Sequence, residues 1–228
     1  MRIKKAVVIL PCLNEEKTVN IVIKKLREVE KKSKIKFIII AINDASTDST
    51  KNKINNADIK IHLEKKVCLS EIMRIGLKKT KEIKPDIVIH IDADLQHNPD
   101  DVIKLLKKID EKTGIVIGTR FNNSNHFEIE KTISNHFFTS IINIITGLNL
   151  NDTQSGFRIL NYDFIKKINL ISSYTYTHEE IMLAKKLGYK IKEVPIKVNK
   201  RKYGNSRLNY IKYLIISLYD IIRISVKN

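Results

Sequence analysis

The stretch that decides the fold reads Ile87-Val88-Ile89-His90-Ile91 and runs directly into Asp92-Ala93-Asp94-Leu95-Gln96-His97. Its apolar first half predicts a buried strand of a parallel sheet. Alternate side chains of an extended chain project to one side, so Asp92 and Asp94 can converge on a single point. Pro99 follows where a helix can begin. This order of strand, acidic turn and helix is typical of the ligand-binding edge of an open α/β sheet.

Two carboxylates at this spacing predict a cation site. They repel each other unless a cation joins them, and Mg²⁺ typically takes one or two carboxylates, some waters and substrate phosphates. We therefore expect a metal–diphosphate site at Asp92 and Asp94, with Gln96 as a neutral oxygen donor. The spacing alone leaves a plainer alternative open, in which the acids belong to a loop that caps the following helix.

The composition indicates one globular α/β domain with a basic surface. The 228 residues are 43% hydrophobic and carry a formal charge of +17, which suits an anionic partner or is simply solvated surface. A phosphorylated substrate or an acidic membrane surface fits this charge. We expect no nucleic-acid partner, because aromatic residues do not interleave with the basic ones and no binding motif is present. Cys12 and Cys68 lack metal-type spacing and indicate reduced thiols in the cytoplasm.

Three strand-plus-helix units precede the acidic turn. Apolar runs at residues 6–10, 37–42 and 59–63 predict strands, and residues with helical spacing follow the first of them, with Asn14 as the expected N-cap. The alternation predicts a mainly parallel sheet with right-handed crossovers.

Two more polar residues are expected at the edge of the sheet that carries the acids. Asp44 follows the strand at 37–42 and has no capping task that the sequence reveals, so it is a candidate ligand contact or else a solvated turn residue. Arg120 follows an apolar run at 114–118, where its guanidinium can hold phosphate oxygens with two hydrogen bonds or can lie at the surface.

Several different short motifs follow one another along the chain. They are Pro11-Cys12-Leu13-Asn14-Glu15, Asn43-Asp44, Asp92-Ala93-Asp94-Leu95-Gln96-His97, Gly118-Thr119-Arg120, Ser155-Gly156-Phe157-Arg158, Glu193-Val194-Pro195-Ile196, and Arg201 with Gly204, Ser206 and Arg207. As an ordered set the chain resembles the family 2 glycosyltransferases. The resemblance is strongest to the branch with dolichol-phosphate mannosyltransferases and bacterial polyprenyl-phosphate glycosyltransferases, and it runs from about residue 6 to residue 210.

The resemblance implies a single GT-A domain, which is a Rossmann-like α/β fold, and a set of site residues. The implied metal ligands for Mg²⁺ or Mn²⁺ are Asp92, Asp94 and Gln96. The implied substrate-binding residues are Pro11, Leu13, Glu15, Ile42, Asp44, Asp92, Ala93, Arg120, Arg201, Ser206 and Arg207. The implied catalytic residues are Asp94, Arg120 and Glu179. Leu13 stands where the family usually has Tyr, so an aromatic contact near the base is missing and the nucleotide stays open.

The reaction that the resemblance implies is inverting transfer of a hexose from a GDP- or UDP-sugar to a polyprenyl phosphate, either dolichyl or undecaprenyl. A lipid phosphate needs no general base, because its second pKa is about 6, and the basic segment 200–207 suits such an acceptor. The alternative acceptor is a saccharide hydroxyl, for which Glu179 can serve as base. Glu179 can also orient the acceptor, or simply stabilise a helix dipole.

The C-terminal segment, residues 209–228, predicts an amphipathic helix appended to a domain of residues 1–208. On a helical wheel its charged residues share one narrow wedge and apolar residues fill most of the rest. These charged residues are Lys212, Asp220, Arg223 and Lys227. We expect a helix that lies on an anionic membrane, peripheral on its cytoplasmic face, or against a membrane-protein partner. The alternative is a terminal helix docked on the core.

Overall fold

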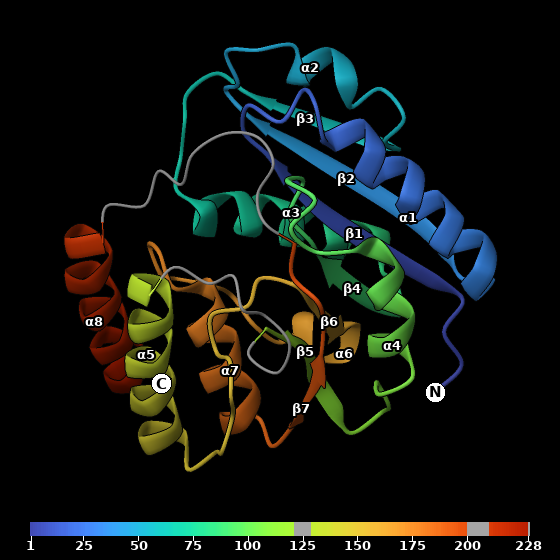
Figure 1. Ribbon diagram of the computed structural model, residues 1–228. Helices are drawn as coiled ribbons and strands as arrows, with labels where there is room; N and C mark the ends of the chain where they lie inside the picture. The colour runs from blue at the N-terminus through green and yellow to red at the C-terminus, as the bar shows by residue number, and fades with distance from the viewer. Residues whose placement is uncertain (121–128, 200–209, 228) are drawn as a thin grey trace.

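The computed structural model describes residues 1–120, 129–199 and 210–227, and its centre is a seven-stranded sheet (Figure 1). The strand order is β3-β2-β1-β4-β6-β5-β7. The strands are β1 (Lys5–Cys12), β2 (Lys36–Asp44), β3 (Ile59–Leu63), β4 (Ile87–His90), β5 (Thr113–Thr119), β6 (Arg158–Asn161) and β7 (Lys190–Pro195). β6 alone runs antiparallel to its neighbours β4 and β5. The predicted single α/β domain with a mainly parallel sheet is confirmed.

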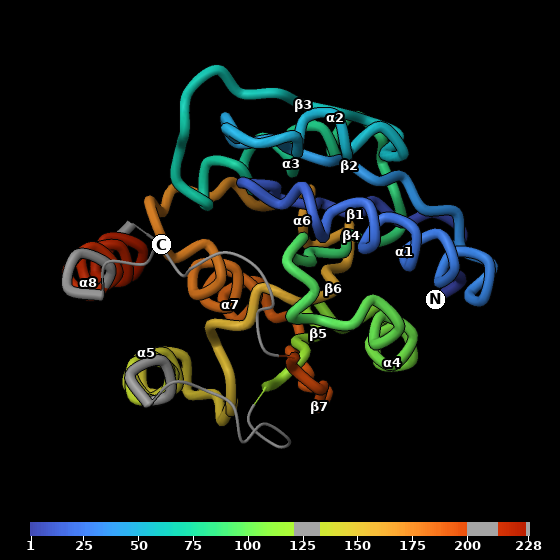
Figure 2. Tube along the Cα trace, turned by 45° about the horizontal axis from the view of Figure 1, so that its top comes forward, coloured from blue at the N-terminus to red at the C-terminus, as the bar shows by residue number. Residues whose placement is uncertain are grey.

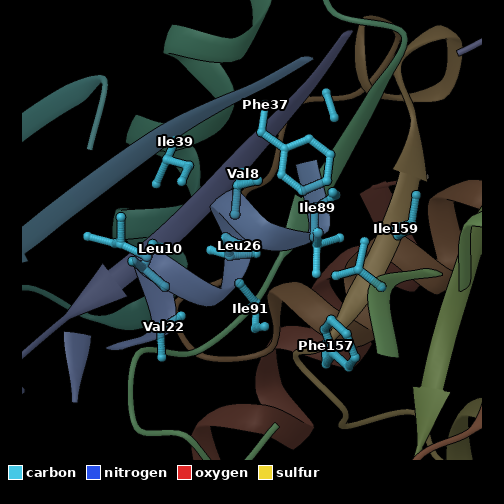
Figure 3. Packing of buried hydrophobic residues seen from close by; sticks show 14 of the residues in the cluster. Val8, Leu10, Val22, Leu26, Phe37, Ile39, Ile89, Ile91, Phe157 and Ile159 are labelled. Atoms are coloured by element: carbon cyan, nitrogen blue, oxygen red, sulfur yellow. The ribbon is translucent and has the colours of Figure 1, made fainter. Parts of the chain in front are cut away.

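Helices cover both faces of the sheet, because its strands are apolar on both sides. One face packs against α1 (Val19–Ser33), the short η1 (Pro99–Asp101) and α4 (Val102–Leu106). Figure 3 shows this layer, with Val22 and Leu26 of α1 seated on Val8 and Leu10 of β1. The other face packs against α3 (Leu69–Ile83), α5 (Ile129–Thr146), α6 (Tyr162–Ile165), α7 (Tyr176–Lys186) and α8 (Tyr210–Lys227). The remaining helix is α2 (Thr50–Lys53).

The loop after β1 differs from its prediction. Asn14 is not a helix cap, since α1 begins at Val19 and its N-cap is Thr18. Asn14 instead adopts the left-handed conformation at φ 56°. Its side-chain oxygen accepts a hydrogen bond of 2.8 Å from the backbone N–H of Thr47. The residue therefore joins the loop after β1 to the loop after β2, a contact that the local pattern did not reveal.

Helix α8 is present as predicted, and one charged residue of its wedge, Asp220, lies inside the domain. Asp220 is fully buried and lies against the chain that leads into α7. Its Oδ2 accepts hydrogen bonds from the backbone N–H groups of Ser173 at 2.8 Å and Tyr174 at 3.0 Å. Backbone N–H groups that are partly shielded from water need an acceptor, and Asp220 supplies it. The predicted boundary between residues 208 and 209 lies outside the described residues.

The opposite face of α8 is apolar and exposed. Its stripe consists of Ile215, Tyr219, Ile222 and Val226, which are 62–82% exposed. In both views α5 and α8 lie outside α7, away from α1 and α4 (Figures 1 and 2). The helix is thus docked through one face, as the core-docked alternative holds, and unpartnered on the other. Within the described residues, no helix combines the length and hydropathy that crossing a membrane requires.

We expect Asp220→Ala to loosen α8. The change leaves the partly buried amides of Ser173 and Tyr174 without their acceptor, which costs about 1 kcal/mol of unfolding free energy. Denaturant unfolding measures that loss, and hydrogen exchange should show faster exchange at both amides. Asp100→Ala is the control, because Asp100 pairs with Lys32 at the surface. Equal stability of the two variants would contradict the anchoring function of Asp220.

Candidate active site

The predicted site residues of four strands meet at one edge of the sheet. β1, β2, β4 and β5 all point their carboxyl ends there, and β6 begins there because it is antiparallel. In the register of the sheet, His90 at the end of β4 pairs with Arg158 at the start of β6. Asp44, Asp92 and Arg120 follow or end these strands. The expectation that these three residues share one side of the sheet is confirmed.

Left-handed backbone residues mark this edge. Asn14, Ala45 and Leu95 have positive φ angles of 56°, 49° and 62°, and they follow β1, β2 and β4 respectively. The other non-glycine residues with positive φ, Lys34 and Lys84, are the C-caps of α1 and α3. Strain of this kind costs free energy and concentrates at functional sites. The three loops are therefore the candidate binding loops.

The acid pair lies in the loop after β4. Asp94 is 5% exposed and its Oδ1 accepts a hydrogen bond of 2.9 Å from the backbone N–H of Gln96. Ala93 between the acids is buried. The helix that follows is capped by Asn98, whose side chain accepts from the N–H of Asp100. The cap of this helix is therefore Asn98 of the same loop, and not one of the two acids.

The residues present fit a divalent cation such as Mg²⁺ or Mn²⁺. The donor set of Asp92, Asp94 and Gln96 consists of carboxylate and amide oxygens, which these hard cations prefer. Gly156 borders the pair: a Cβ atom built on it would lie 3.7 Å from Oδ2 of Asp92 and 3.0 Å from the hydroxyl of Tyr176. A glycine here lets the backbone approach the carboxylate closely.

The chain that enters the basic segment passes over the acid loop. After β7, the N–H of Ile196 donates to the carbonyl of Thr119 at 2.9 Å. Val198 forms a bridge with His97, and the N–H of Asn199 donates to the carbonyl of Gln96 at 2.9 Å. Asn199, the last described residue before the basic segment, therefore lies against the acid loop. The predicted site residues Arg201, Ser206 and Arg207 lie outside the described residues.

Arg120 has a protein partner that the sequence did not reveal. Its Nε and Nη2 donate to the two carboxylate oxygens of Asp152 at 2.7 and 2.8 Å. Burial would raise the pKa of Asp152, but the adjacent guanidinium outweighs it and holds that pKa below its usual value. Glu193 in turn accepts from the N–H of Asp152 at 3.0 Å. Asp152 lies 32 residues after Arg120, so no local pattern identified it as the partner.

The charges around the acid loop influence the pKa of His97. It is buried and stacks on Phe157 with 5.3 Å between ring centroids. Burial and the charge of Arg120 lower its pKa to about 4, against the opposite influence of Asp94 and Asp152. His97 is therefore neutral at pH 7 and packs as a ring. Arg120 and the acid pair are close enough to act on the same groups.

The residues implied for nucleoside binding differ in accessibility. Pro11, Leu13 and Glu15 are half-buried at the edge, whereas Ile42 is fully buried in the core. Asp44 is not a helix cap, but it has a structural partner within the domain. Its Oδ1 accepts a hydrogen bond of 2.8 Å from the N–H of Val67, the start of the chain into α3. The partner is distant in sequence, so no local pattern announced it.

Glu179 is fully buried in the first turn of α7. Its two carboxylate oxygens accept from the backbone N–H groups of Ile171 at 2.7 Å and Ser172 at 2.8 Å. A general base needs access to the proton that it removes. This geometry disfavours Glu179 as a base, and the two bonds hold the chain before α7, a function that the sequence did not reveal.

Comparison with known proteins agrees with this geometry. Residues 7–169 match the model of the family described as Glycosyl transferase family 2. An uncharacterized protein of Methanocaldococcus jannaschii is 34% identical over 209 residues, which cover 88% of this chain and 84% of the relative. A Methanococcus voltae protein named UDP-N-acetylglucosamine–dolichyl-phosphate N-acetylglucosaminyltransferase is 29% identical over 224 residues, 87% of each chain.

Solved structures with low sequence identity share the fold. Glucosyl-3-phosphoglycerate synthase of Mycobacterium tuberculosis, in complex with Mn²⁺, uridine diphosphate and phosphoglyceric acid, aligns with a TM-score of 0.76 at 20% identity, covering 98% of this chain and 78% of that one. Mannosyl-3-phosphoglycerate synthase of Rubrobacter xylanophilus gives 0.75 at 14% identity, covering 99% and 73%. Taken with the family match and the 34% identical relative, they show that the chain belongs to glycosyl transferase family 2 and is a glycosyltransferase with a GT-A-like fold.

Proposed function

We propose that this enzyme transfers a hexose, with inversion, from a nucleotide diphosphate sugar to a polyprenyl phosphate at a membrane surface. The observation that carries the proposal is the path of the chain after β7, which brings Asn199 into contact with Gln96 of the acid loop. The basic segment that follows Asn199 in the sequence is proposed to supply positive charge for the acceptor, beside a cation site for the donor.

The donor end rests on the acid loop. A divalent cation held by Asp92, Asp94 and Gln96 supplies positive charge to the diphosphate leaving group. Arg120, fixed in orientation by Asp152, adds a guanidinium near the same edge. A UDP-sugar is the donor in the name of the Methanococcus voltae relative, and the nucleoside is assigned to the loops that carry Pro11, Leu13, Glu15, Ile42 and Asp44.

The acceptor end rests on charge and on the state of Glu179. A phosphate monoester is already mostly dianionic at neutral pH, so it attacks without a general base. This chemistry agrees with a Glu179 whose two oxygens are bound to backbone amides. Arg201, Ser206 and Arg207 are proposed to hold the acceptor phosphate. A dolichyl phosphate is the acceptor in the name of the same relative.

The membrane contact rests on α8. Its apolar stripe of Ile215, Tyr219, Ile222 and Val226 faces away from the domain. A net charge of +17 attracts an anionic leaflet, and apolar side chains on a helix face can then insert at the level of the headgroups. We assign this face to the cytoplasmic side of an anionic membrane, because the proposed acceptor resides there.

We expect Asp94→Asn to abolish metal-dependent nucleotide binding. The change keeps the acceptor for the N–H of Gln96 and removes the charge that a cation needs. Calorimetry with Mn²⁺ and UDP or GDP should show binding weakened by at least about a hundredfold. Asp100→Asn serves as the control, since Asp100 lies on the next turn at the surface. If the wild type binds neither nucleotide in the presence of Mn²⁺, the proposed function fails.

The acceptor is identified by product extraction. We expect a labelled hexose from the sugar nucleotide to enter the organic phase when undecaprenyl or dolichyl phosphate is supplied, and not to be transferred to a saccharide or to phosphoglycerate. Loss of a general base typically lowers turnover by about a hundredfold or more. We expect Glu179→Gln to lower turnover by less than that. Transfer to a hydroxyl that Glu179→Gln abolishes would favour the saccharide alternative.

The membrane contact is tested by flotation with anionic vesicles. We expect the variant Ile215→Ser with Ile222→Ser to float at least about tenfold less than the wild type, because both side chains leave the apolar stripe. Ile21→Ser is the matched control, because Ile21 is an exposed isoleucine of α1 on another side of the molecule. Equal flotation of all three proteins would contradict the assignment of α8.

A further inference from the structure

A charged cluster lies buried behind the acid loop. Arg158 and Glu180 are 0% exposed and His90 is 1% exposed, although they come from β6, α7 and β4. Nη1 of Arg158 donates to Oε2 of Glu180 at 3.0 Å. Buried ion pairs of this kind lose hydration and are weak evidence of stabilisation by themselves. The Arg158–Glu180 pair, however, lies next to the candidate site, and this position indicates a function beyond stability.

Arg158 holds the loop that borders the acid pair. Its Nε donates to the carbonyl of Ser155 at 3.0 Å, and Nη1 also donates to the carbonyl of Thr177 at 3.0 Å. Ser155 precedes Gly156, where a built Cβ atom would lie 3.7 Å from Oδ2 of Asp92. The guanidinium therefore joins this loop to the first turn of α7.

Glu180 also lies close to the end of β4. Its Oε1 lies 3.7 Å from Nδ1 of His90. His90 is the last residue of β4 and pairs in register with Arg158, and Asp92 follows it by two positions. Neither Oε1 of Glu180 nor either ring nitrogen of His90 has a hydrogen-bond partner. The carboxylate of Glu180 thus contacts both His90, at the end of the strand that precedes the acid loop, and Arg158, which holds the opposing loop.

We propose that Glu180 is a positioning residue for the metal–diphosphate site, which it serves by fixing Arg158 and hence the Ser155-Gly156 backbone against Asp92. The inference rests on the proposed function for the identity of the ligand. Glu180 is fully buried and acts through Arg158. Outer residues that orient metal ligands typically change metal affinity or activity by about ten- to a hundredfold when removed.

The electrostatics of the cluster support this assignment. Burial raises the pKa of Glu180 to about 7, against the opposing influence of Arg158 and with a further increase from Glu179. The charged groups that face Glu180 are thus Arg158 from β6 and Glu179 from its own helix, while His90 from β4 is kept neutral by burial and by Arg158, which lower its pKa. At pH 8 Glu180 carries the charge that Arg158 requires, and at pH 6 it has largely lost that charge.

The test compares wild type and Glu180→Gln by calorimetry with Mn²⁺ and UDP or GDP. Glutamine keeps the size and an acceptor but loses the charge. We expect about ten- to a hundredfold weaker binding at pH 8. The ratio of the two affinities should shrink at pH 6, where the wild type is itself protonated, and a purely structural residue would not produce that pH dependence. Glu30→Gln is the control, because Glu30 pairs with Arg27 far from this edge. Equal affinities at pH 8 overturn the proposal.

Two further measurements keep the inference separate from folding and from the proposed function. Hydrogen exchange without ligand should be faster at the Gly156 amide in Glu180→Gln and unchanged in β1, and an unchanged Gly156 overturns the proposal even if no nucleotide binds. If Glu180→Gln does not fold, the double change Arg158→Met with Glu180→Met removes both charges together, which buried pairs often tolerate. It should fold and still bind weakly, and full affinity in it overturns the proposal.

Discussion

The reversal of one strand, β6, is the constraint on which the site depends. Since β6 runs antiparallel between β4 and β5, its first residue lies beside the last residue of β4. The loop before β6 is thereby brought to the edge where the parallel strands end. A fully parallel sheet would place the start of β6 at the opposite edge, far from Asp92. The buried side chain of Arg158 secures this junction, because a guanidinium without water must find acceptors, and the nearby loop carbonyls supply them.

What the sequence predicts well is set by short-range periodicity. Apolar runs and helical spacing are properties of neighbouring residues, so the alternation of strands and helices and the parallel half of the sheet follow from them. The placement of Asp92, Asp94 and Arg120 also follows, since strand ends in a parallel sheet share an edge. Motif order then narrows the choice of chemistry.

What the sequence predicts poorly is set by partners distant in the chain. Asp44 is bound by the amide of Val67 and Arg120 by Asp152, contacts that span 23 and 32 residues. Glu179 accepts backbone amides that only the turn before α7 brings near it. The sequence alone does not distinguish an acidic residue that binds a ligand from one that accepts a hydrogen bond from a buried N–H group. The distinction requires knowledge of which amides lack other acceptors.

In helix α8, one such contact buries a charged residue that was expected at the surface, while the apolar face of the helix stays exposed. A helical wheel assigns charged residues to solvent, but Asp220 lies inside because the amides before α7 need an acceptor that no apolar residue offers. Burying that face rotates the rest of the helix outward, and with it Ile215, Tyr219 and Ile222. The apolar surface that suggested a membrane contact is therefore exposed as a result of the buried acid. The same carboxylate that docks the helix on the domain determines which face is left for a lipid surface.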